Sequence, residues 1–123
     1  MNTKLLMTSS ALFLAVMGLI LSFLPNEVAE YLQVEQNLIS ILFLKTLSAL
    51  YLGFGILNWM ARGTLIGGIY NRPIAIGNFM HFLVGAISLV KVIGDIEMHR
   101  GVFISLSAVY VIFAILFAYV FKT

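Results

Sequence analysis

Four long apolar segments constrain the fold of this 123-residue chain more than any other feature. They cover roughly residues 4–24, 38–60, 74–94 and 102–121, and few charged residues interrupt them. As a helix, each segment is long enough to cross about 30 Å of hydrocarbon at about 1.5 Å per residue. We therefore predict four transmembrane helices in a single transmembrane domain that occupies residues 1–123.

Composition favours lipid as the medium around these segments. Hydrophobic residues make up 62% of the chain and charged residues 10%, which is more apolar surface than a compact soluble domain buries. Strands of a membrane barrel alternate in polarity over about 10 residues, whereas these segments are continuously apolar. The predicted fold is an all-α integral membrane protein, an antiparallel four-helix transmembrane bundle.

The first segment resembles a secretory signal only at its start. Its apolar run is longer than that of a signal, and no small-residue cleavage motif precedes Pro25. We expect it to remain as the first helix. The acidic connection after it, residues 25–37, is expected to form a short amphipathic turn of helix at the membrane interface.

Basic residues predict the orientation of the bundle. Positive charge concentrates on the cytoplasmic side of membrane proteins, so both termini are predicted to be cytoplasmic. The predicted inner side carries more basic residues than the outer side: Lys4, Arg62, Arg72 and Lys122, against Lys91 and Arg100.

Polar residues recur at helical spacing on the second and third segments. A Lys or Asp in hydrocarbon costs about 2.5–3.5 kcal/mol on insertion scales, so these faces are expected to point inward and toward each other. The first segment instead has a face of small residues, which predicts close helix packing. The three faces are Lys45, Ser48, Leu52, Gly55, Trp59 and Arg62; Asn78, His81, Gly85, Ser88, Val92 and Asp95; and Thr8, Ala11, Ala15, Gly18 and Ser22.

These faces suggest where a ligand would bind. The hypothesis is a non-enzymatic protein that binds a lipid-like or small amphipathic ligand, or a membrane-protein partner, between the second and third helices. Two arginines, Arg62 and Arg72, are candidates to hold lipid headgroups, although topology alone also explains them. The ligand-binding candidates are Lys45, Asn58, Trp59, Asn78 and His81, and a separate outer ion-pair network is expected at Lys91, Asp95 and Glu97.

A small dimeric proton-linked transporter is the alternative hypothesis. In that case His81 and Lys45 would change protonation as access switches, because imidazole titrates near neutral pH. Two competing interpretations remain open: His81 as a hydrogen-bonded packing residue, and Lys45 as a side chain that extends to the membrane surface.

Several classes of function lack support in the sequence. Cysteine is absent, and His81 and His99 are 18 residues apart, roughly 27 Å along a continuous helix, so no metal site is predicted. Phosphate-binding loops and hydrolase motifs are missing. The basic residues do not cluster, so nucleic acid is not an expected partner. We predict no cofactor and no catalytic residues.

Three short stretches in and between the second and third segments resemble a known family. Residues 47–62 (LSALYLGFGILNWMAR), 71–73 (NRP) and 78–81 (NFMH) are similar to small bacterial four-helix membrane proteins that are broadly DoxX-like. The resemblance covers mainly the second and third segments. It implies a helical fold and a multi-pass location in the bacterial inner (cytoplasmic) membrane, without implying an activity.

Overall fold

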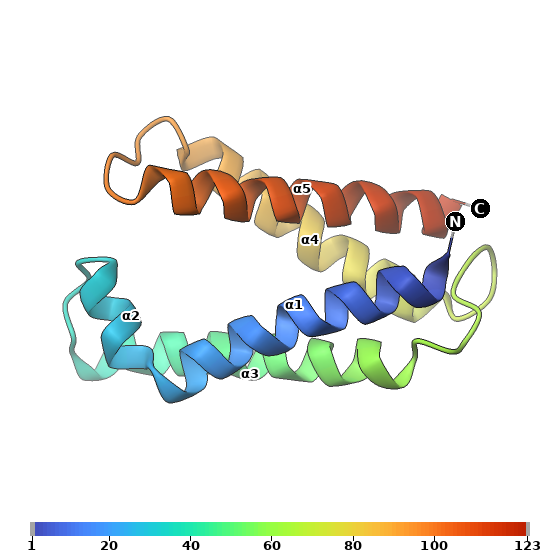
Figure 1. Cartoon of the computed structure of the whole chain (residues 1–123), viewed down its shortest axis with the longest axis horizontal. Coiled ribbons are helices and arrows are strands. Elements are labelled where there is room, and N and C mark those ends of the chain that lie inside the picture. Colours follow the sequence, from blue (N-terminus) through green and yellow to red (C-terminus); the bar gives the residue numbers. More distant parts are fainter. Residues whose placement is uncertain (1, 123) are drawn as a thin grey trace. The chain divides into compact units, whose positions relative to one another are not determined.

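A computed structural model describes residues 2–122, and for residue 121 it describes the backbone alone. Over that range the regular structure is entirely helical (Figure 1). Four helices are long and apolar enough to cross a membrane, which confirms the predicted all-helical fold and the four apolar segments, whereas the antiparallel bundle stays a prediction. The helices are α1 (Thr3–Phe23), α2 (Pro25–Tyr31), α3 (Leu38–Met60), α4 (Arg72–Val92) and α5 (Arg100–Lys122).

Local sequence explains where these helices begin. The Asn37 side chain accepts a hydrogen bond of 2.8 Å from the backbone N–H of Ser40, which caps α3. Helix α4 begins at Arg72, earlier than the predicted residue 74, because Pro73 fits in a first turn where its missing N–H is not needed. The residue before this helix, Asn71, has a left-handed backbone (φ 51°), and its amide donates to the Leu65 carbonyl at 2.7 Å.

The chain divides into two compact units, Lys4–Gly63 and the segment that begins at Thr64. The first unit contains α1, α2 and α3, and the second contains α4 and α5. Packing of the second predicted span against the third would join α3 to α4, which belong to different units. That packing stays a prediction.

Small residues join α1 to α3. A Cβ added to Gly55 would lie 3.1 Å from the backbone nitrogen of Ala15, and one added to Gly18 would lie 2.7 Å from Cγ of Leu52. The paired residue numbers run in opposite directions, so the helices are antiparallel, as Figure 1 shows. The contacts confirm the predicted packing role of Ala15 and Gly18 on the small-residue face of the first helix.

Aromatic rings join α4 to α5 in the second unit. The Phe82 ring lies 5.2 Å from that of Tyr110 and is stacked on that of Phe117 at 5.8 Å, between ring centroids. A Cβ added to Gly85 would overlap the Tyr110 ring. The glycine therefore leaves room for the edge of the Tyr110 ring against α4, and the two helices form an antiparallel hairpin (Figure 1).

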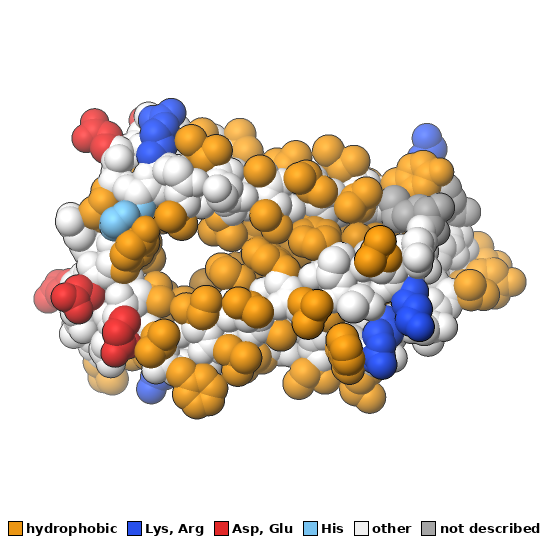
Figure 2. Space-filling view, viewed as in Figure 1, with side chains coloured by type: hydrophobic (Ala, Val, Ile, Leu, Met, Phe, Trp, Pro, Cys, Tyr) orange, Lys and Arg blue, Asp and Glu red, His pale blue; other side chains and the backbone are white. Residues whose placement is uncertain are grey.

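The outer faces of the helices are apolar. Large side chains in mid-helix remain exposed, for example Leu50 at 57% and Ile112 at 55%. Figure 2 shows hydrophobic side chains along the flanks of the helices and charged side chains toward the helix ends. Extended apolar surface of this kind is informative, because soluble proteins avoid it whereas a bilayer requires it.

Exposed hydroxyl groups on these faces bond to their own helix. Thr46, Ser88 and Ser105 each donate to the carbonyl four residues earlier, at 2.9 Å. In water such side chains find solvent partners, but in lipid the carbonyl of the preceding turn replaces them. The pattern suits helices that are surrounded by hydrocarbon.

Gly55 provides a test of the α1–α3 contact. We expect Gly55→Val to destabilise the protein by about 1–3 kcal/mol, since the added side chain meets the backbone of α1. Gly53→Val is the matched control, because nothing lies within 4 Å of a Cβ at Gly53 and the change in helix propensity is the same. Unfolding in mixed detergent micelles measures both variants, and equal losses would contradict the proposed contact.

Candidate functional site

Two buried asparagines are bonded within their own units. The Asn58 amide donates to Oγ of Ser10 at 3.1 Å, and the Ser10 hydroxyl in turn donates to the Met7 carbonyl at 3.1 Å. The Asn78 amide donates to the Ile74 carbonyl at 3.0 Å. Asn58 thus links α3 to α1 by a polar contact, and sequence reasoning missed its partner because Ser10 lies outside the small-residue face.

His81 is bonded to α5. Its Nε2 lies 3.1 Å from the hydroxyl oxygen of Tyr110, and its ring meets that of Phe82 edge-on at 4.9 Å. Which of the two groups donates depends on the tautomer of the imidazole. This contact agrees with a packing role for His81, and a role in proton transfer stays a prediction.

Trp59 and Arg62 form a pair at the carboxyl end of α3. The guanidinium carbon lies 4.0 Å from the centroid of the indole ring, and Nη1 donates to the Trp59 carbonyl at 2.6 Å. Such a cation–π contact holds the charge in a fixed place. Because 44% of Trp59 is exposed, the pair lies at the surface of its unit.

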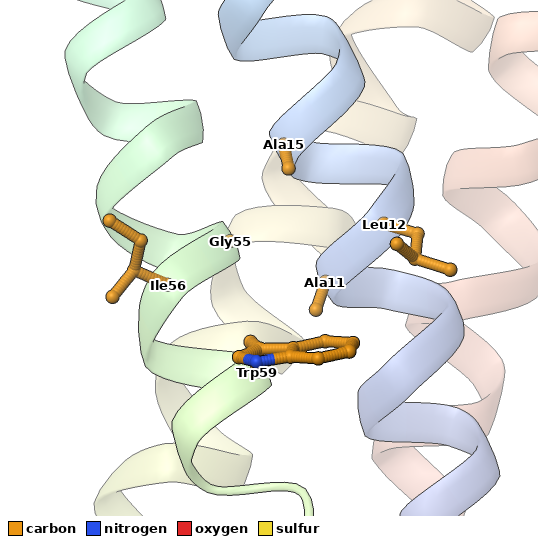
Figure 3. A pocket seen from close by; sticks show the side chains of 6 residues that line it. All are labelled: Ala11, Leu12, Ala15, Gly55, Ile56 and Trp59. Carbon is orange, nitrogen blue, oxygen red and sulfur yellow. The ribbon is translucent and has the colours of Figure 1, made fainter.

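A groove of about 270 Å³ lies between α1 and α3. Figure 3 shows the Trp59 indole extending from α3 toward α1, with Ala11 and Ala15 above it. The small side chains create the space, because they bring the helix backbones close without filling the surface between them. The lining residues are Ala11, Leu12, Ala15, Gly55, Ile56 and Trp59.

The pair α4–α5 has a groove of its own, of about 350 Å³. Lys91, in the last turn of α4, is the one charged residue among those that line it. Sequence reasoning missed both grooves, although the recurrence of Ala and Gly at helical spacing was a usable signal. The lining residues are Leu83, Ala86, Ile87, Val90, Lys91, Val111, Ala114 and Ile115.

The predicted ligand-binding residues are divided between the units. Lys45, Asn58 and Trp59 belong to the first, whereas Asn78 and His81 belong to the second. Lys45 is exposed, unlike the two asparagines. A single cavity shared by all five residues stays a prediction.

The predicted charged groups lie near helix ends. Arg72 is exposed at the start of α4, where its Nε donates to the Gly68 carbonyl at 3.2 Å. Lys91, Asp95 and Glu97 are exposed around the end of the same helix, and their ion-pair network stays a prediction. Across residues 2–122, no group of three or more His, Asp or Glu side chains is placed to hold a metal ion.

Comparison with protein-family models, curated proteins and solved structures finds no match for this chain. The DoxX-like resemblance therefore stays a prediction. Functional inference depends on the residues, their contacts and the two grooves.

Tyr110 provides a test of the His81 contact. In a double-mutant cycle of Tyr110→Phe with His81→Leu, we expect a coupling energy of about 0.6 kcal/mol, typical of a hydrogen bond between helices in lipid. A cycle of Tyr119→Phe with His81→Leu is the control, because Tyr119 is exposed on the same helix. Unfolding in mixed micelles measures both cycles, and zero coupling in the first would show that the hydrogen bond does not stabilise the hairpin.

Proposed function

We propose that this protein is a non-enzymatic, multi-pass membrane protein that binds an anionic phospholipid in the groove between α1 and α3. One observation carries the proposal: the Arg62 guanidinium lies on the Trp59 ring, and that ring lines the groove. An apolar slot is thereby joined to a fixed positive charge. A phospholipid has the matching chemistry, with an acyl chain next to a phosphate.

The groove suits one part of a lipid better than a complete ligand. Its volume of about 270 Å³ is slightly below the range of about 300–1,000 Å³ that is typical of small-molecule sites. Leu12 and Ile56, on its rims, are exposed, so the slot is open to the surrounding medium. In a bilayer, acyl chains are the apolar groups that reach such a surface.

The charge at Arg62 supports a phosphate partner. Arginine presents five N–H donors in a planar arrangement that suits phosphate oxygens, and the Trp59 carbonyl takes a bond from one of its nitrogens. Asn58 then has a supporting role, because its buried amide joins α3 to α1. The ligand contact is proposed for Trp59 and Arg62 instead.

Orientation is part of the proposal. With both termini cytoplasmic, Arg62 would face the inner leaflet, where anionic lipids attract basic residues by about 1 kcal/mol each. The antiparallel four-helix bundle and the bacterial inner membrane belong to the same proposal, supported by the distribution of basic residues and by the DoxX-like resemblance.

Lipid retention tests the proposed function. We expect the full chain in lipid nanodiscs to retain phosphatidylglycerol in preference to phosphatidylcholine, and Arg62→Gln to lower retention at this groove about fivefold, as loss of about 1 kcal/mol implies. Lys4→Gln is the control, since it removes the same charge at the same end of the unit. Native mass spectrometry measures the retained lipid.

Two results would contradict the proposal. Equal losses in Arg62→Gln and Lys4→Gln would mean that surface charge alone attracts the lipid. Unchanged retention in Arg62→Gln would mean that the groove has no headgroup contact at this residue.

A further inference from the structure

The groove between α4 and α5 combines apolar walls with one cation. Its α4 residues, Leu83, Ala86, Ile87, Val90 and Lys91, recur at spacings of three and one, so they share one face of the helix. The face extends about 12 Å along the helix axis. Lys91 is at its carboxyl end, and every other lining residue of the groove is apolar.

Small residues leave this groove open. Ala86 and Ala114, both 6% exposed, form its floor, and the larger Ile87 and Ile115 form rims that are 49% and 62% exposed. One turn before Ala86, the Phe82 ring packs against rings of α5, so the space between the helices is filled there. The groove extends from Leu83, next to Phe82, to Lys91 in the last turn of α4.

We propose that this groove is a second phospholipid site, in which an acyl chain lies on Ala86 and Ala114 and the phosphate contacts the Lys91 ammonium. The occupant is a bilayer phospholipid with an anionic headgroup. The volume of about 350 Å³ is within the range of ligand sites. Lys91 is exposed, and no acidic residue lines the groove to compete with a phosphate inside it.

Each groove belongs to one unit, and each has its cation near the carboxyl end of a long helix. Arg62 follows the carboxyl end of α3, whereas Lys91 is in the last turn of α4. Binding at Lys91 therefore does not depend on binding at Arg62.

The nearest acidic side chains are outside the groove. Asp95 and Glu97 are exposed in the connection that follows α4. A carboxylate of either residue that neutralised Lys91 would compete with a lipid phosphate for the ammonium. Substitution of Lys91 distinguishes a lipid phosphate partner from a carboxylate partner. Retention of anionic lipid depends on Lys91 only if the ammonium contacts the lipid phosphate.

Lys91→Gln in the full chain, reconstituted in nanodiscs of phosphatidylglycerol and phosphatidylcholine, tests the site. We expect it to lower retention of phosphatidylglycerol at this groove about fivefold, as measured by native mass spectrometry of the lipid population that Arg62→Gln leaves in place. Arg100→Gln is the control: it removes the same charge at the same end of the hairpin, from a residue that does not line this groove, and should leave that retention unchanged. Equal effects of Lys91→Gln and Arg100→Gln, or no effect of Lys91→Gln, would overturn the proposal.

A second variant tests the apolar part. Ala114→Phe should fill the groove and displace the lipid although Lys91 remains, whereas Ala108→Phe, at an exposed position of the same helix, should not. Wild-type lipid retention in a folded Ala114→Phe protein would overturn the proposal. If Ala114→Phe does not fold, comparison of Lys91→Gln with its control variant still tests the proposal.

The two sites are distinguishable in the same measurement. Arg62→Gln should leave the Lys91-dependent lipid in place, and Lys91→Gln should leave the Arg62-dependent lipid. Loss of one lipid population without the other therefore separates failure of this inference from failure of the proposed function.

Discussion

Lipid as the surrounding solvent is the constraint on which the other features depend. Apolar side chains gain little by leaving hydrocarbon for a protein interior, so helices associate through close contact and a few polar bonds. Gly55 against the backbone of Ala15, and Gly85 against the ring of Tyr110, are contacts of this kind. The exposed hydroxyls of Thr46 and Ser88 bond to carbonyls of their own helices, as hydrocarbon surroundings would require.

Buried polar groups and exposed cations have different roles in this chain. Asn58 bonds to Ser10 and His81 bonds to Tyr110, so each unit has a polar side chain that joins two of its helices. The charges that adjoin the two grooves belong to Arg62 and Lys91, near helix ends. A chain arranged in this way offers apolar slots with a cation beside them, which is the chemistry that the proposed lipid binding requires.

The sequence predicted the helices better than it predicted their contacts. Each continuous apolar run is about as long as one membrane span, so the sequence predicted all four long helices with boundaries that differ by at most two residues. The packing role of Gly18 followed from its spacing. The sequence did not predict that Ser10 is the partner of Asn58. Helical spacing shows which residues share a face of one helix, but not which residue of another helix they contact. A groove forms between two helices, so the sequence of one helix alone does not predict it.

Exposure of the mid-helix residues to hydrocarbon is the most direct test of this account. The chain has no cysteine, so single cysteines at Leu50 and Ile112 carry spin labels without background. In proteoliposomes, these labels should collide frequently with oxygen and rarely with a water-soluble nickel chelate, whereas a label at Glu35, between α2 and α3, should show the reverse. Labels at Leu50 and Ile112 that met the nickel chelate as often as the label at Glu35 would show that water, not lipid, surrounds these helices.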